Sequence, residues 1–234
     1  RTTIAQCVAG ALAKLALRQL APQMDIYAFC SQIGPIYANN PADIKAARAI
    51  SDSNAVRCPD SEAANKMESL IKEVHKEQDS IGGVVSCIIE NCPVGLGEPL
   101  FDKLHARLGY TMLNINAAKG FEYGDGFDSA TQRGSYHNDS FTTNEKGSIA
   151  TTSNHSGGIQ GGISNGQTIS FRVAFKPTPT IGIAQQTVDK NLNAVTLEAK
   201  GRHDPCVVPR AVPVVENCAA FVILDSLLMN KIWQ

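Results

Sequence analysis

The sequence predicts an α+β protein, in which helices and strands are mixed without the strict alternation of a parallel doubly wound sheet. Three observations support this class. Apolar residues recur at helical spacing near the amino end and again after residue 60, a β-branched run at 84–89 is typical of a buried strand, and the apolar segment 212–229 fits a buried helix. With 234 residues and 43% apolar content, the chain can bury a sizeable core.

The first half of the chain is predicted to contain two helices followed by a strand. The first helix carries an apolar stripe that we expect to pack in the core; it consists of Ile4, Val8, Leu12, Leu15 and Ala16. A second helix is expected to begin at Asp60 or Ser61, either of which can cap its free amide groups. Gly82 and Gly83 end this region, and the strand at 84–89 follows.

The second half contains a polar region between further helices and strands. Residues 101–108 are predicted to be a short helix and 110–117 extended chain. Apolar density collapses between Gln132 and Gly166, where we expect a ligand-facing loop region. The elements expected after it are strands at 168–175 and 195–199 and a helix at 212–229, with Pro213 in its first turn.

Composition excludes several classes of partner and location. The formal net charge is −1, from 21 basic and 22 acidic residues, so no overall field favours nucleic acid or an acidic membrane. No apolar run approaches the roughly 20 residues of a membrane span, and the chain has no secretory start, so we expect a cytoplasmic protein. The seven scattered cysteines are expected to be reduced, mostly buried thiols, and no metal site is predicted.

The segment Gly157–Gly166 is the most unusual local feature. Its glycines allow positive φ angles and close approach of the backbone to a ligand, so its amide groups could hold an anion or a planar ring. A tight bend between two strands explains the same residues equally well. The spacing matches neither the nucleotide-hydrolase phosphate loop nor the dinucleotide fingerprint, which disfavours a generic nucleotide-phosphate binder.

The segment that follows the predicted strand at 168–175 combines residue types suited to binding an anion. Lys176-Pro177-Thr178-Pro179-Thr180 places a cation and two hydroxyls on a stiff turn at the end of a predicted strand, although a solvated lysine beside a turn is the simpler explanation of the spacing.

The segment Gly201–Arg210 contains an arginine that can bind a carboxylate or phosphate, a histidine and Asp204, a carboxylate able to accept a proton. A structural arginine–aspartate pair closing a turn is the alternative. His75 and His105 are interpreted as solvent-exposed or core residues, and His137 and His155 lie in the polar region without a partner at recognisable spacing.

Taken together and in this order, six segments resemble the chorismate synthase family. They are Asp79–Gly83, Pro93–Leu104, Ile115–Phe127, Gly157–Gly166, Phe175–Thr180 and Gly201–Glu216. The resemblance spans most of the chain and implies one domain over residues 1–234, folded as a β-α-β sandwich with helices layered between antiparallel sheets and assembled as a homotetramer. It also implies a lyase that uses reduced FMN to eliminate phosphate from 5-enolpyruvylshikimate-3-phosphate, giving chorismate for aromatic amino-acid biosynthesis.

The resemblance also implies roles for individual residues. Asp204 matches the aspartate that works with the flavin N5 region as a base, and Arg202 matches a residue that contacts flavin and substrate. Arg1 matches an arginine that contacts the substrate, although Thr2 stands where the family usually has glutamate. The remaining flavin-binding positions are Asn116, Ala117, Gly161, Lys176, Pro177, Thr178, Pro179 and Thr180.

One part of the family pattern is absent from this chain. The family's amino-terminal portion carries two histidines that serve as acids, together with several substrate-binding arginines, and the chain begins at Arg1 without an initiator methionine. We therefore expect a chain truncated at its amino end. The rival hypothesis is a noncatalytic scaffold that binds flavin or another anion but lacks the acids.

Overall fold

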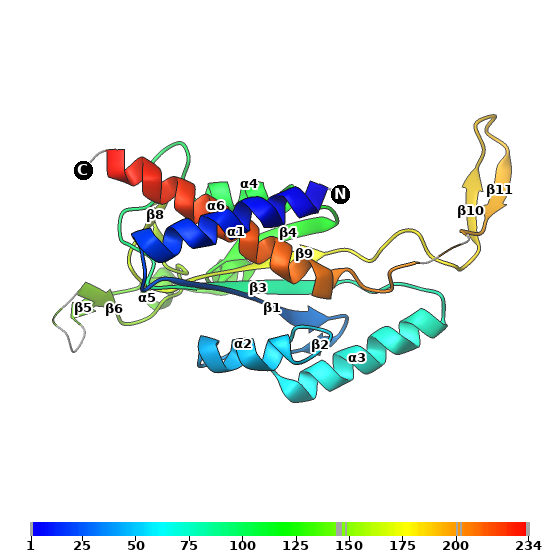
Figure 1. The fold of residues 1–234 in the computed structure, drawn as a ribbon, viewed down its shortest axis with the longest axis horizontal. Helices are drawn as coiled ribbons and strands as arrows, with labels where there is room; N and C mark the ends of the chain where they lie inside the picture. Colours follow the sequence, from blue (N-terminus) through cyan, green and yellow to red (C-terminus); the bar gives the residue numbers. More distant parts are fainter. Residues whose placement is uncertain (1, 144–146, 148, 200, 202, 233–234) are drawn as a thin grey trace. The chain divides into compact units, whose positions relative to one another are not determined.

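A computed structural model describes residues 2–143, 147, 149–199, 201 and 203–232 (Figure 1). The chain divides into two compact units. The first unit comprises Arg1–Ala28, Ser86–Val173 and Val212–Gln234, and the second comprises Phe29–Val85 and Ala174–Ala211. The chain therefore passes several times from one unit to the other. The single domain expected over residues 1–234 stays a prediction.

The main sheet has five strands in the order β2-β1-β3-β9-β4. Their bounds are β1 Asp25–Ile33, β2 Ile36–Tyr37, β3 Gly83–Glu90, β4 Ala118–Tyr123 and β9 Ile169–Phe175. Buried and more accessible residues alternate along β9, which is the expected pattern for a strand with one face in the core. The strands expected at 84–89 and 168–175 are confirmed, whereas β1 was not predicted.

Helix α1 (Thr2–Leu20) forms where it was predicted, but the face assigned to the core is wrong. The predicted stripe is largely exposed, at 67% for Ile4 and 63% for Leu12. The buried residues are instead Gly10, Ala13 and Leu17. A Cβ added to Gly10 would lie 2.2 Å from Asn217 Cβ, so this small-residue face is the one that lets α1 lie closely against α6.

Helix α6 (Val208–Ile232) confirms the predicted carboxyl-terminal helix but begins four residues earlier. Pro213 consequently lies inside the helix rather than in its first turn. Within the described part of the chain, α6 alone is long and apolar enough to cross a membrane, which corrects the expectation from the sequence that no apolar run approaches that length. Such a helix is weak evidence for a membrane span, because 56% of its apolar 18-residue stretch is buried inside the structure, as in the core helix of a globular protein.

In the second unit, α2 (Ile44–Asp52) and α3 (Ser61–Lys76) are both capped by aspartates. Asp60 accepts hydrogen bonds of 3.0 Å from the amides of Glu62 and Ala63, so it is the cap of α3, and Ser61, the other candidate from the sequence, is not. This unit also carries the hairpin of β10 (Gln185–Val188) and β11 (Ala194–Leu197), whose residues are all exposed. Every cysteine in the chain is a free thiol and six of the seven are buried, as expected.

The polar half of the first unit contains more regular structure than the sequence predicts. Helix α4 (Leu104–Leu113) includes residues that were expected to be extended, because Leu108 and Met112 belong to one buried helical face. The region 132–166 is likewise not a structureless loop. Its elements, with the turn before it, are η1 Gly126–Thr131, α5 Gly134–His137, β5 Phe141–Thr143, β6 Ile149–Thr151, β7 Ile159–Gln160 and β8 Ile163–Ser164.

Candidate functional site

The predicted site residues are divided between the two units. Asn116, Ala117 and Gly161 belong to the first unit, whereas Lys176–Thr180 and Asp204 belong to the second. Arg1 and Arg202, the two predicted substrate contacts, lie outside the described residues.

The glycine-rich segment forms a hairpin, as the simpler of its two interpretations predicts. β7 and β8 pair antiparallel, with Ile159 opposite Ser164, and Gly161 and Gly162 form the turn with φ of 61° and 95°. A Cβ on Gly162 would lie 2.5 Å from Lys103 Cγ, so this glycine is required by packing. A Cβ on Gly161 would meet no described atom within 4 Å, so this side of the turn is open to a ligand.

Asn116 and Ala117 lie in the turn between α4 and β4. The Ala118 amide donates a 3.1 Å hydrogen bond to the Ile115 carbonyl across this turn. Ala117 has a φ of 71°, which non-glycine residues rarely adopt. Such a conformation costs about 1–3 kcal/mol and is often found at ligand sites.

The turn Lys176–Thr180 follows directly after β9. Pro177 and Pro179 fix two φ angles and have no amide hydrogen to donate. Lys176 is half-buried, whereas Thr180 is exposed. The Thr178 hydroxyl oxygen is buried and has no hydrogen-bond partner among the described residues, which is unusual for a buried polar atom.

Asp204 forms an ion pair with Arg210 at the start of α6, within its own segment. The Arg210 side chain is 78% exposed and that of Asp204 33%, so the pair is open to solvent. This contact matches the structural arginine–aspartate pair that the sequence left as an alternative. His203 does not join it, because its Nε2 lies 2.9 Å from the Ala199 carbonyl oxygen.

A third segment, Asp79–Gly83, brings the two predicted site segments of the second unit together. The Ser80 hydroxyl donates a 2.6 Å hydrogen bond to the carbonyl of Thr178, in the proline-rich turn. The next residue, Ile81, donates its amide hydrogen to the carbonyl of Pro205, beside Asp204, at 2.8 Å. Adjacent residues of one segment thus hold both the turn and the backbone next to the carboxylate.

A cavity of about 590 Å³ lies beside this junction, a size typical of small-ligand sites. Its lining includes Lys76 and His203 as nitrogen-bearing groups and Asp79 and Glu198 as carboxylates. His75 also lines it and is exposed, in agreement with the solvent-exposed interpretation of that residue.

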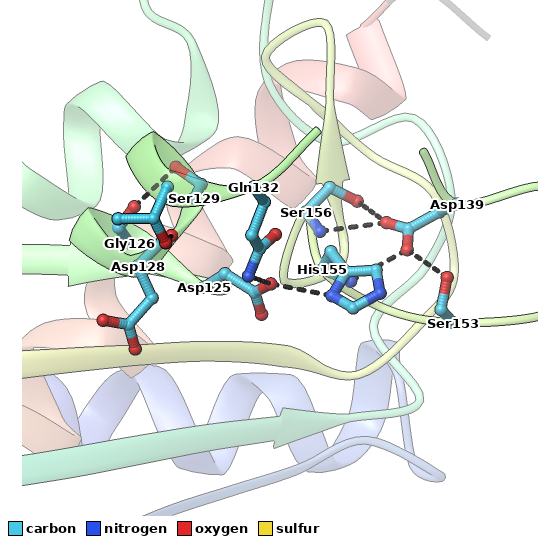
Figure 2. Close-up of polar contacts among 10 residues, drawn as sticks. Asp125, Gly126, Asp128, Ser129, Gln132, Asp139, Ser153, His155 and Ser156 are labelled. Carbon is cyan, nitrogen blue, oxygen red and sulfur yellow. Dashed lines mark hydrogen bonds and ion pairs between the residues drawn. The ribbon is translucent and has the colours of Figure 1, made fainter. Parts of the chain in front are cut away.

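In the first unit, the buried carboxylate of Asp139 accepts hydrogen bonds from residues of the polar region (Figure 2). It accepts hydrogen bonds from the Ser153 hydroxyl at 2.7 Å and the His155 amide at 2.8 Å. The amide and hydroxyl of Ser156 donate to its other oxygen at 2.9 and 2.5 Å. Burial alone raises the pKa of this carboxyl, but the four hydrogen bonds outweigh it and lower the pKa to about 2.

His155 has a partner that sequence spacing did not reveal. Its Nδ1 lies 2.7 Å from Asp125 Oδ2, which also accepts a hydrogen bond from Gln132 (Figure 2). The ring borders a cavity of about 710 Å³ whose lining includes the aromatic side chains of Phe121, Tyr123 and Phe127. Because Asp125 precedes His155 by 30 residues, the pair becomes visible only when the chain is folded.

His105 borders the same cavity. Its ring stacks on Tyr123 at 4.7 Å. Burial, followed by the charge of Lys103, lowers the pKa of His105 and favours its neutral form.

Comparison with known proteins identifies the family. The family profile described as chorismate synthase matches residues 1–228. The chain belongs to the chorismate synthase family. Among curated chorismate synthases, that of Cytophaga hutchinsonii is 55% identical over 99% of this chain and that of Parabacteroides distasonis is 56% identical over 99%. The chorismate synthase of Gloeothece citriformis is 54% identical over 98%.

The fold agrees with this assignment. A solved structure described as a crystal structure of chorismate synthase matches with a TM-score of 0.78 and 29% identity over 97% of the chain, which confirms the α+β class. The chain spans about 63% of the length of these relatives and of that structure.

Proposed function

We propose that the protein eliminates phosphate from 5-enolpyruvylshikimate-3-phosphate to give chorismate, using reduced FMN, and that this chain supplies the flavin-binding turn and the base. The observation that carries the proposal is the pair of hydrogen bonds from Ser80 and Ile81. They join the Lys176–Thr180 turn to the backbone beside Asp204 within one unit. A flavin phosphate bound by this turn would therefore share a site with that carboxylate.

Several described residues fit an FMN molecule. Lys176 provides a cation, and the hydroxyls of Thr178 and Thr180 provide donors, on a turn with two fixed φ angles. The buried Thr178 hydroxyl, which lacks a protein partner in the described part of the chain, is available to a phosphate oxygen. In the first unit, the open side of Gly161 and the positive φ of Ala117 suit backbone that lies against a planar ring.

The chemistry that reduced FMN supplies when bound is a transient donation of electron density to the substrate ring while phosphate leaves. Asp204 is placed in this scheme as a base that works together with the flavin N5 region, toward which the ring proton leaves. The Arg210 guanidinium holds the Asp204 carboxylate in position from within the same segment. Arg202 and Arg1 are proposed to bind the anionic groups of the substrate, as their match to the family implies.

The assembly and location of the protein are part of the same proposal. We infer a homotetramer located in the cytoplasm, with no nucleic-acid or membrane partner. The near-zero formal charge of −1 supports the absence of a nucleic-acid partner. The exposed apolar stripe of α1, with Ile4 at 67% and Val8 at 57% exposure, is consistent with a surface that other protein covers.

The test is chorismate formation with reduced FMN under anaerobic conditions, measured on the 234-residue chain and on the full-length product of its gene. We expect turnover in the full-length product and none in the 234-residue chain, because the acids of the family's amino-terminal portion are not in this sequence. Equal turnover in both would show that the acids of the amino-terminal portion are not required for the reaction. Turnover in neither would favour the noncatalytic scaffold.

A further inference from the structure

The segment Gln78–Gly82 lies along the turn segment Phe175–Gly182 with the opposite chain direction. The Gly182 amide donates to the Gln78 carbonyl at 2.9 Å, and the Ser80 hydroxyl donates to the Thr178 carbonyl at 2.6 Å. At the far end, a Cβ added to Gly82 would lie 2.4 Å from the Phe175 carbonyl oxygen. The contacts therefore extend over the whole length of the proposed flavin-phosphate turn.

The same segment is anchored at both of its own ends. The Asp79 amide donates to the Val74 carbonyl at 3.0 Å, which ties the segment to the end of α3. The Gly34 amide donates to the Gly82 carbonyl at 3.0 Å, which ties it to the β1–β2 turn. Both anchors belong to the second unit, so the segment can act as a fixed support for the turn it contacts.

The proline-rich turn needs such a support from outside. Pro177 and Pro179 cannot donate backbone hydrogen bonds, so the turn has few amide groups with which to fix itself. Ser80 supplies a donor from a side chain 98 residues away in sequence. Its acceptor is the carbonyl of Thr178, and the hydroxyl of that threonine has no protein partner in the described chain.

We propose that Ser80 is a positioning residue, whose hydroxyl holds the Lys176–Thr180 turn in the geometry that binds an FMN phosphate. Gly82 contributes by permitting the close approach, since any side chain there would collide with Phe175 or Pro177. Ile81 extends the effect to the segment of Asp204 through its bond to Pro205. The inference rests on the proposed function, in which this turn binds the flavin.

The test compares three serine variants with Lys176→Ala, which removes the cation of the proposed flavin-phosphate turn. Ser80→Ala removes the hydrogen bond, and Ser80→Thr retains a hydroxyl. Ser69→Ala is the matched control, because Ser69 also donates to a backbone carbonyl, that of Asn65 at 2.9 Å, but on an exposed turn of α3. The measurements are FMN affinity by fluorescence titration, hydrogen exchange of residues 176–182, thermal stability, and turnover of the full-length product at saturating FMN.

For Ser80→Ala we expect roughly 3- to 10-fold weaker FMN binding, the effect of one lost hydrogen bond, with faster exchange in residues 176–182. Turnover at saturating FMN should fall by a smaller factor than FMN affinity, because bound flavin itself helps to hold the turn. Ser80→Thr should restore affinity, and Ser69→Ala should leave affinity and exchange unchanged.

The outcomes separate this inference from the proposed function. Unchanged exchange in Ser80→Ala would show that Ser80 does not hold the turn. Faster exchange with unchanged FMN affinity, while Lys176→Ala binds FMN weakly, would overturn the positioning role alone. If neither Ser80→Ala nor Lys176→Ala alters FMN affinity, the proposed flavin site and the role of Ser80 in it both fall. If Ser80→Ala and Ser80→Thr both lower the thermal stability and Ser80→Thr does not restore FMN affinity, the role of Ser80 is merely structural.

Discussion

Replacement of Asp139 by asparagine should destabilise the polar region of the first unit. The carboxylate is 4% exposed and accepts four hydrogen bonds, from Ser153, His155 and twice from Ser156. An amide keeps the shape of the side chain but presents its own hydrogen atoms to the donors on one side. The variant therefore tests the charged acceptor rather than the volume of the side chain.

The magnitude follows from the pKa of Asp139, which the fold lowers from 3.8 to about 2. That difference corresponds to about 2 kcal/mol of stability in favour of the ionised form. Because the folded pKa is depressed, this contribution is fully present above pH 5. It falls as the pH drops through 3.8 toward 2, and about half of it remains at pH 3.

The assay is urea unfolding of the unmodified chain and of Asp139→Asn at pH 7 and at pH 3. The difference in unfolding free energy should be about 2 kcal/mol at pH 7 and about half as large at pH 3. Asp128→Asn is the control, since Asp128 is exposed on η1 nearby. A difference below about 0.5 kcal/mol at pH 7, or one independent of pH, would refute the reasoning.

Three further predictions concern the site and the fold. Asp204→Ala in the full-length product should lower turnover by roughly 10²- to 10⁴-fold with the melting temperature little changed, and an unaltered turnover number would exclude Asp204 as the base. Lys176→Ala should weaken FMN binding roughly 10-fold or more in a fluorescence titration, and unchanged affinity would mean a solvated lysine. Asp60→Ala should lower the free energy of unfolding in urea by about 1 kcal/mol, because the hydrogen bonds from the Glu62 and Ala63 amides are lost at the start of α3. Equal stability would show that Asp60 does not stabilise this helix as a cap.

The sequence predicted correctly those elements that depend only on residues close together in the chain. The cap at Asp60 and the β-branched run of β3 are examples, since both depend on neighbours in sequence. The core face of α1 was predicted wrongly because periodicity locates an apolar stripe but not what packs against it. In this helix, Gly10 and Ala13 allow close approach, and that face is buried instead.

The candidate site shows the same limit at longer range. The segment Lys176–Thr180 and Asp204 could be selected from the sequence, because a cation, hydroxyls or a carboxylate beside prolines form a local pattern that suits anion binding or proton transfer. Ser80 could not be given a role, since its partner lies 98 residues away and the hydrogen bond exists only in the folded chain. The Asp125–His155 pair escaped prediction for the same reason.

The most direct test of the account is the stoichiometry of the reaction catalysed by the full-length product with reduced FMN under anaerobic conditions. The account predicts equal amounts of phosphate and chorismate from 5-enolpyruvylshikimate-3-phosphate, with the flavin still reduced at the end. Absence of chorismate, or chorismate formation that needs no flavin, would contradict it.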